Sequence, residues 1–312
     1  MSEYNIRKRP VISVAVNPRN EGDREKFLRA LSVIVQEDRA IRIRTSSDDV
    51  PTILSGMSKE HLEAICDRLL REFRLQLDIG EPTVIYLETV HRSAEGESRY
   101  IRQTGGAGNY GHVKIRVEPN EAGKGFEFVN DIKGGVVPRE YIKPTEQGIR
   151  EALQGGVLAG YETVDVKATL FDGSFHDVDS NEIAFKIAGS MAFKEAARKA
   201  TPVLLEPVMS VEVVVPEEYT GAIISDLNSR RGRIEGMEQR AGSQVIRALV
   251  PLAEMLGYGR GRFYHSVQFA RYEAAPRRDW LGGDGAGVTA NKPVRPRTGS
   301  GFAANDLYAE PE

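Results

Sequence analysis

Residues 102–117 have the sequence RQTGGAGNYGHVKIRV, a glycine-dense loop followed by alternating apolar and charged residues. The glycines let this backbone turn tightly and come close to a bulky partner, and Gln103, Asn109 and His112 supply hydrogen-bonding groups. The loop therefore suits contact with RNA. A glycine cluster alone is more often a hairpin turn, so the neighbouring segments decide between the two interpretations.

Residues 10–82 are predicted to form a ferredoxin-like domain, because their elements follow the order βαββαβ. Strands are predicted at 11–16, 41–45, 52–54 and 75–79, and helices at 23–36 and after Ser58. Phe27, Leu31 and Ile34 are expected to point inward in the first helix. Ser58 is expected to cap the second helix, whose apolar face includes Cys66, the single cysteine of the chain.

The same order of elements returns at residues 206–275, which predicts a second ferredoxin-like domain. Strands are expected at 208–215, 233–239, 243–250 and 263–273. Pro216 is expected at the first position of the intervening helix, and Gly232 is expected to end it.

Residues 83–205 are predicted to form a separate α+β domain between these two. Its strands are expected at 84–90, 112–117, 126–130 and 163–171, and its helices at 144–154 and 181–199. Asp179 together with Glu182 is expected to cap the second helix. Residues 276–312 are rich in Gly, Pro, Ala, Asn and Arg without periodicity, which predicts a flexible, disordered tail.

Composition favours a cytoplasmic protein whose contacts with nucleic acid are local. The net charge of -3 gives no overall positive field, so any RNA contact must come from a particular segment. Residues 1–10 are polar and basic without an apolar signal core, and no apolar run has transmembrane length. No membrane partner is therefore expected.

No catalytic residue, metal site or cofactor is expected. The histidines are scattered, without the paired spacing of a zinc site, and no Gly-x-Ser-x-Gly elbow occurs. Residues 172–177 contain Ser, His and Asp, but side chains so close along one loop seldom form a triad. The pair Gly123-Lys124 lacks the other glycine and the hydroxyl residue of a P-loop, so no GTP site is expected on this chain.

Residues 102–113 resemble the RQTGGRGQYGHV segment of translation elongation factor G, and further segments resemble that family in the same order. These are FEFVN at 126–130, GGVVPREYI at 134–142, DGSFHDVDS at 172–180, FKIAGSMA at 185–192 and DLNSRRG at 226–232. The resemblance runs from about residue 10 to 275 and covers only the third, fourth and fifth domains of the family. It does not include the family's GTPase domain.

The resemblance implies that the middle domain folds like the second domain of ribosomal protein S5. It also implies that this domain enters the decoding region of the ribosome and contacts rRNA, tRNA and mRNA through two tip loops. In this sequence the loops include Gln103, Thr104, Gly105, Gly106, Gly108, Asn109, Tyr110, Asp172, Gly173, Ser174, His176 and Asp179. The aspartates would repel phosphates unless a cation or backbone amide offsets their charge, and the alternative for His176 is a local cap of its own turn.

Two features depart from the family pattern. Ala107 stands where the family has arginine, so one phosphate contact is expected to be lost. After Tyr258 the chain is about nine residues shorter, which shortens the second helix of the last domain by roughly two turns. Candidate rRNA contacts in this domain are Arg230, Arg231, Arg260 and Arg262. For the last two, a basic loop between helix and strand is the simpler interpretation.

The sequence thus predicts a ribosome-binding translocation arm that carries no GTPase of its own. Directional movement would then require a separate GTPase chain, and without one the arm would act as a regulator or competitor at the A site. The alternative is a decayed paralogue, or a protein-interaction module, that does not bind the ribosome.

Overall fold

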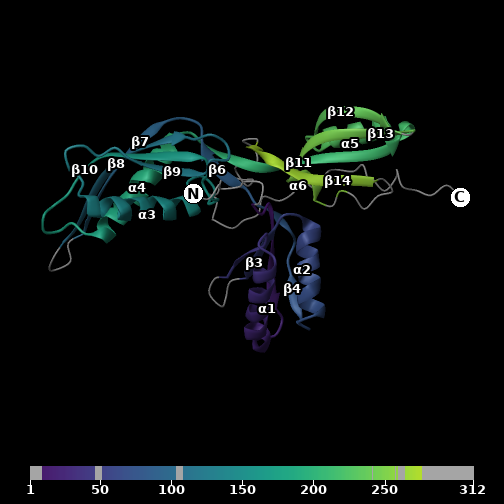
Figure 1. The fold of residues 1–312 in the computed structure, drawn as a ribbon, viewed down its shortest axis with the longest axis horizontal. Coiled ribbons are helices and arrows are strands. Elements are labelled where there is room, and N and C mark those ends of the chain that lie inside the picture. Colours follow the sequence, from purple (N-terminus) through teal and green to yellow (C-terminus); the bar gives the residue numbers. More distant parts are fainter. Residues whose placement is uncertain are drawn as a thin grey trace, which may run out of the picture. The chain divides into compact units, whose positions relative to one another are not determined.

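The computed structural model describes residues 9–45, 51–102, 108–240, 242–256, 258 and 264–275. Contacts group these residues into two compact units, one made of Tyr86–Leu205 with Ala274 and Ala275 and one of the described parts of Ile6–Ile85 and Glu206–Glu273. The described residues form an α+β fold whose strands belong to separate sheets (Figure 1). Among them, no helix is long and apolar enough to cross a membrane. The tail predicted at 276–312 lies outside the described residues.

The first domain is ferredoxin-like. Its elements are β1 (Ile12–Pro18), η2 (Glu21–Asp23), α1 (Arg24–Glu37), β2 (Arg42–Arg44), β3 (Thr52–Gly56), α2 (Lys59–Arg71), β4 (Leu77–Ile79) and β5 (Thr83–Val84). The strand order is β2-β3-β1-β4, and β5 also pairs with β1. As predicted, α1 buries Phe27, Leu31 and Ile34. Ser58 caps α2, because its Oγ accepts the backbone N–H of His61 at 3.2 Å.

The last domain repeats this arrangement. It consists of β11 (Pro202–Pro216), η3 (Glu217–Tyr219), α5 (Thr220–Ser229), β12 (Arg233–Arg240), β13 (Ser243–Pro251), α6 (Leu252–Met255) and β14 (Tyr264–Ala274). The strand order is β12-β13-β11-β14, which matches the order of the first domain. The second helix, α6, has 4 residues.

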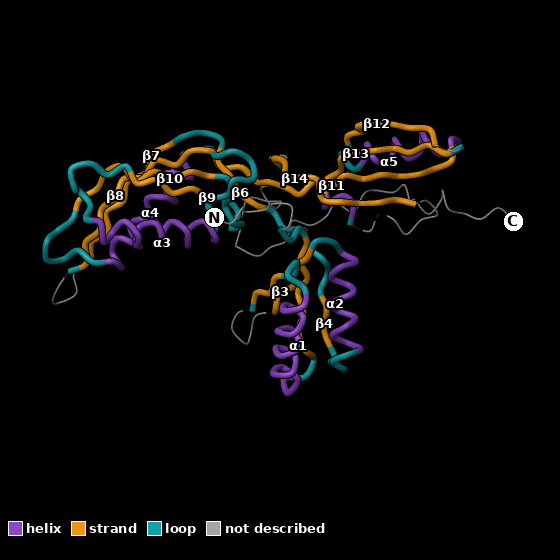
Figure 2. Tube along the Cα trace, in the orientation of Figure 1, coloured by secondary structure: helices purple, strands orange, loops and turns teal. Residues whose placement is uncertain are grey.

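The middle domain is a two-layer α+β unit. Its elements are β6 (Leu87–Val90), β7 (Ala94–Arg102), β8 (Asn109–Pro119), β9 (Phe126–Asn130), α3 (Arg139–Gln154), β10 (Val166–Ser174) and α4 (Glu182–Lys199). The main sheet has the order β7-β8-β10-β9, in which only β9 and β10 run parallel. Helices α3 and α4 pack together beside this sheet (Figure 2). Between the layers lie Ile115, Ile149, Leu170, Phe185 and Phe193, all fully buried.

Strand β10 contains a bulge between Leu170 and Asp172. Leu170 pairs with Ile115, but Asp172 pairs with the very next residue of β8, Lys114, so β10 has one extra residue. Ile115 is buried against the helices, whereas Lys114 is on the open face of the sheet. The bulge therefore places Asp172 on the open face.

Strand β7 was not predicted from the sequence, because its residues lack apolar alternation. Its two buried residues are Gly96 and Ser98, and the residues that alternate with them, Glu95, Glu97 and Arg99, are charged and exposed. The buried residues must be small because β7 packs directly on α4. A Cβ atom on Gly96 would lie 2.3 Å from the carbonyl oxygen of Ala192.

Two predicted strands have different limits in the structure. The strand predicted at 84–90 was wrong as a single element, because Thr83–Val84 pairs with β1 whereas Leu87–Val90 pairs with β11. The strand predicted at 163–171 runs from Val166 to Ser174 instead. Asp165 breaks the extended chain before it, with a left-handed φ of 53° and a carboxylate that accepts the Gly125 N–H at 2.8 Å.

Helix α3 starts at Arg139, five residues before the predicted start at Pro144, which lies inside the helix. The ring of Tyr141 stacks on Phe185 with centroids 4.4 Å apart, and this contact holds the first turn despite the proline. Asp179 does not cap α4 as predicted. The helix begins at Glu182, so the cap is Asn181, whose Oδ1 accepts the Ala184 N–H at 2.9 Å.

The end of α5 also differs from the prediction. Arg231, rather than Gly232, has the left-handed conformation, with φ of 59°. The Gly232 N–H donates to the Leu227 carbonyl at 2.8 Å, and a Cβ on Gly232 would lie 2.4 Å from that oxygen. Gly232 is thus required because its backbone comes close to Leu227, and not because of its φ.

The start of this helix differs as well, because Pro216 is the last residue of β11 and precedes the η3 turn.

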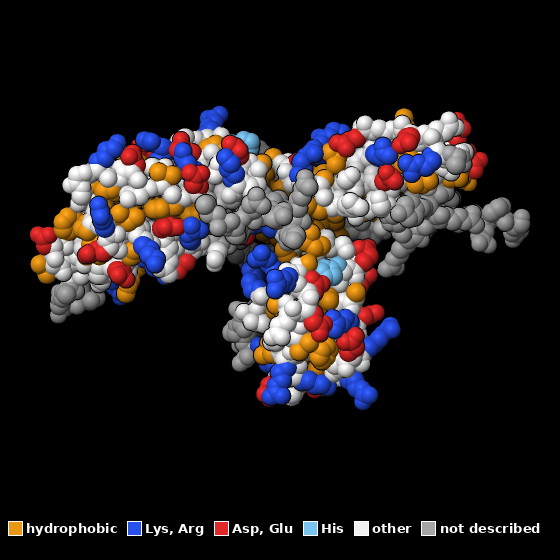
Figure 3. All heavy atoms as spheres, in the orientation of Figure 1, with side chains coloured by type: hydrophobic (Ala, Val, Ile, Leu, Met, Phe, Trp, Pro, Cys, Tyr) orange, Lys and Arg blue, Asp and Glu red, His pale blue; other side chains and the backbone are white. Residues whose placement is uncertain are grey.

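Charges of both signs are mixed on the surface. In Figure 3, Lys and Arg side chains alternate with Asp and Glu over the visible face of each unit, which agrees with the net charge of -3. Any binding of a polyanion must therefore depend on local groups of cations.

Candidate functional site

Two loops of the middle domain meet at one end of its sheet. One is the β7–β8 connection with the start of β8, of which residues 108–110 are described, and the other is the end of β10 with the β10–α4 connection, residues 172–181. The Gly108 N–H donates to Asp179 Oδ1 at 2.9 Å, and the Tyr110 N–H donates to the Asp179 carbonyl at 2.8 Å. Asn181 Nδ2 donates to Asn109 Oδ1 at 2.7 Å. We call these two paired segments the tip.

The structure thus brings together the described members of both predicted loops. Gln103, Thr104, Gly105 and Gly106 lie outside the described residues, as does Ala107. The residue that sequence reasoning missed is Asn181, which both caps α4 and binds Asn109. Its position directly before the helix was the available signal.

His176 occupies an exposed turn of the tip. The backbone N–H groups of Val178 and Asp179 lie 3.4 and 3.3 Å from its Nδ1, and the Asp179 carboxylate lies 3.5 Å from the same nitrogen. The side chain is 57% exposed, and its ring centroid lies 6.3 Å from that of Tyr110. His176 therefore caps its own turn and still presents one ring edge outward.

A chain of hydrogen bonds crosses the open face of the sheet beneath the tip. Ser174 Oγ lies 2.8 Å from the Tyr110 hydroxyl and 2.7 Å from His112 Nδ1. His112 Nε2 lies 2.8 Å from Glu97 Oε1. His112 is buried within β8, so it supports the tip from below and does not offer the exposed hydrogen-bonding group that the sequence suggested.

The charge of Asp172 is offset by a lysine of β8 next to the tip. Lys114 Nζ lies 3.0 Å from Asp172 Oδ2, directly across the β8–β10 pair. The hydrogen bond from Lys114 lowers the pKa of the Asp172 carboxyl, and the Gly173 N–H adds to this effect. The same bond raises the pKa of Lys114. Lys114 is therefore a neighbouring cation that would offset the repulsion between Asp172 and a phosphate.

Apolar side chains are exposed on the same loop. Phe175 is 42% exposed and Val178 is 75% exposed. The backbone beneath them is fixed, because the Tyr141 hydroxyl donates to the Ser180 carbonyl at 3.1 Å and the His176 N–H donates to Ser180 Oγ at 2.9 Å. Fixed apolar and polar groups side by side are suited to unpaired bases and riboses of irregular RNA.

The predicted arginines of the last domain have intramolecular partners. Arg231 binds Glu206 through both terminal nitrogens, at 2.9 and 2.8 Å, and its Nε binds Glu254 at 3.1 Å. Burial alone would lower the pKa of Arg231, but hydrogen bonds and charge from these carboxylates raise it. Arg230 pairs with Asp226 and lies 4.8 Å above the Tyr258 ring. Arg260 and Arg262 lie outside the described residues.

Comparison with known families matches these domains one after another. Residues 8–81 match elongation factor G domain III, residues 82–201 match domain IV, and residues 203–277 match the elongation factor G C-terminus. The chain belongs to the elongation factor G family. The tip described above is formed entirely by the domain IV segment. The predicted limits at 10–82, 83–205, 206–275 and 276–312 stay predictions.

A solved structure supports the fold. The chain is similar to a crystal structure from Thermus thermophilus, with 38% sequence identity and a TM-score of 0.66 over 86% of this chain. It covers 41% of that protein, so the two are compared over less than half of the longer chain.

Proposed function

We propose that this chain binds the ribosome and that its tip enters the decoding region, in contact with rRNA, tRNA and mRNA. The observation that carries the proposal is the tip itself. Gly108, Asn109 and Tyr110 from one loop are hydrogen-bonded to Asp179 and Asn181 of the other. Such a pre-formed end can enter a narrow RNA site without paying a large ordering cost.

The proposed role is that of a binding arm in the cytoplasm and not of an enzyme. GTP would be bound and hydrolysed by a separate chain, whose cycle would bias entry and release of the arm. In the absence of that partner, occupancy of the A site would slow translation by competition. Cosedimentation with 70S ribosomes over a salt series tests the binding, which should weaken steeply as salt rises. No binding at low salt would favour the alternative of an interaction module without ribosome affinity.

The position of the tip can be tested with a tethered iron–EDTA probe that cleaves nearby RNA. Val178→Cys places the probe on the tip, where residue 178 is 75% exposed. The native Cys66 does not compete for the reagent, because it is buried and its thiol pKa is raised to about 11. We expect cleavage of small-subunit rRNA in the decoding region.

The matched control is Leu28→Cys on α1, where the residue is 39% exposed. A probe at this position reports on the first domain and should give a different set of cleavages. Identical patterns from positions 28 and 178, or no decoding-region cleavage from position 178 in a chain that binds ribosomes, would contradict the proposed placement.

A further inference from the structure

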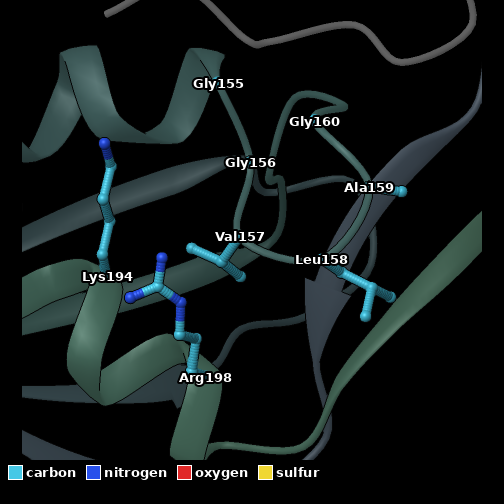
Figure 4. A pocket seen from close by; sticks show the side chains of 8 residues that line it. All are labelled: Gly155, Gly156, Val157, Leu158, Ala159, Gly160, Lys194 and Arg198. Atoms are coloured by element: carbon cyan, nitrogen blue, oxygen red, sulfur yellow. The ribbon is translucent and has the colours of Figure 1, made fainter. Parts of the chain in front are cut away.

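Two adjoining hollows lie on the flank of the middle domain, away from the tip. One, of about 170 Å³, is lined by the loop 155–160 together with Lys194 and Arg198. The other, of about 350 Å³, lies between α4 and β7 and is lined by the same two cations, with Arg99 on the β7 side. We call the two hollows together the flank groove. Figure 4 shows Lys194 and Arg198 extending from α4 beside the loop.

The flank groove is separate from the tip. Asn181 of the tip caps the start of helix α4, and Lys194 lies 13 residues beyond this cap. At 1.5 Å per residue, this places Lys194 about 20 Å and Arg198 about 25 Å from the start of the helix. A ligand in the groove would therefore contact a second surface of the domain.

The cations of the groove are free to bind an external anion. In the described part of the chain, Arg99, Lys194 and Arg198 have no ion-pair partner. Two carboxylates, those of Glu97 and Glu195, also line the second hollow, and both have partners. Glu97 Oε1 lies 2.8 Å from His112 Nε2. Glu195 binds Lys199 at 2.6 Å and accepts the Glu97 N–H at 3.3 Å.

One wall of the groove is rigid and made largely of backbone. The carboxylate of Glu88, which is fully buried, accepts N–H groups of the loop, among them Val157 at 2.6 Å and Ala159 at 2.7 Å. Gly156 has φ of +60°, and a Cβ there would lie 2.5 Å from Glu88 Oε1. A loop fixed in this way, with small residues at 155, 156, 159 and 160, leaves space for a bulky chain to approach.

We propose that the flank groove binds the sugar-phosphate backbone of an RNA strand, with Lys194 and Arg198 each contacting a phosphate. Positive side chains one helical turn apart, facing a wall of small residues, are complementary to a flexible polyanion. The contacts go to phosphates, so they position the domain and carry no sequence information. The identity of the RNA as ribosomal rests on the proposed function, whereas the groove itself does not.

The test compares Lys194→Gln/Arg198→Gln with the control Lys124→Gln/Lys133→Gln. The control removes the same charge from exposed lysines of the same domain that pair with Glu121 and Asp131. Binding of a fluorescein-labelled 20-nucleotide poly(U) RNA to the full chain is measured by anisotropy from 50 to 200 mM salt. Each lost phosphate contact should flatten the log–log salt slope by about 0.7, hence about 1.4 for the groove variant. Between 50 and 200 mM salt, the groove variant should therefore lose about sevenfold less affinity for the RNA than wild-type protein loses.

Equal slopes for the groove variant and the control would overturn the proposal. The proposal would also fail if the groove variant kept the wild-type salt slope for poly(U) but bound a polyglutamate decamer more weakly, since that result would indicate an acidic peptide as the ligand. Cosedimentation with 70S ribosomes is run in parallel. Wild-type protein that binds poly(U) through the groove but does not sediment with ribosomes would refute the proposed function, and the proposed RNA binding by the groove would still hold. Wild-type protein that sediments with ribosomes, together with a groove variant whose salt slope for poly(U) is unaltered, would refute only RNA binding by the groove.

Discussion

Replacement of Glu88 by Gln tests how the loop at 155–160 is held. Glu88 is fully buried, and its two oxygens accept four backbone N–H groups: Val157 at 2.6 Å, Leu158 at 2.9 Å, Ala159 at 2.7 Å and Tyr161 at 3.1 Å. A glutamine has the same shape but only one accepting oxygen. Its NH₂ group would face two of these donors, and both would be left unsatisfied in a buried site.

Each buried donor without an acceptor costs about 1–3 kcal/mol, so Glu88→Gln should destabilise the loop by about 4 kcal/mol. Because 1.4 kcal/mol corresponds to a factor of ten, the amides of the pair that faces the NH₂ group, either Val157 with Leu158 or Ala159 with Tyr161, should exchange with solvent deuterium about 1,000-fold faster. Native-state hydrogen exchange measured by NMR or mass spectrometry reads this directly. It also avoids treating a chain of several domains as a two-state folder.

The control for this prediction is Glu95→Gln, which removes an exposed carboxylate that pairs with Arg116 at 2.7 Å. Exposed pairs contribute little to stability, so exchange in the loop should not change. If exchange at residues 157–161 in the Glu88 variant stayed within threefold of wild type while the rest of the domain remained protected, the carboxylate would not be what fixes the loop.

Three further predictions concern other parts of the chain. Burial raises the pKa of Cys66 to about 11, so at pH 8 iodoacetamide should alkylate it about 100-fold more slowly than in urea, and a ratio under tenfold would contradict its burial. The lowered pKa of Asp172 adds stability that is present above its unfolded value near 4 and is lost as pH falls through the folded value. Lys114→Met should remove this acid dependence and move the Asp172 carboxyl titration upward by NMR, and an unmoved titration would disprove the pairing. Gly96→Ala should destabilise the middle domain by about 2–4 kcal/mol in urea melts, because its Cβ would lie 2.3 Å from an α4 oxygen, whereas Gly22→Ala, with no atom within 4 Å, should be neutral.

The regular parts of the fold could be predicted from the sequence because apolar periodicity reports burial. The face of α1 with Phe27 and Ile34 and the cap at Ser58 follow from local rules and agree with the structure. Strand β7 did not follow from such rules, since its buried residues, Gly96 and Ser98, are small only because α4 lies against them. A contact between segments about a hundred residues apart leaves no periodic signal in either.

The same reason limits prediction of the site. The family resemblance located both tip loops, but the environment of His112 depends on Glu97, which belongs to the strand that was not predicted. Lys114 could be read as one of the charged residues of an alternating strand. Its pairing with Asp172 depends on the register of β8 and β10, which no local pattern shows.

The bulge in β10 sets which side chains the tip can display. In an uninterrupted ladder, the second residue after Leu170 would point back among the helices, and a carboxylate there would be enclosed by hydrocarbon. The additional residue shifts the alternation of side chains along the strand. Residues before the bulge, such as Leu170, pack in the core, whereas Asp172 and Ser174 after it lie on the open face of the sheet. An insertion or deletion of one residue between the bulge and Ser174 would reverse this alternation, and the polar side chain of Ser174 would then point toward the core.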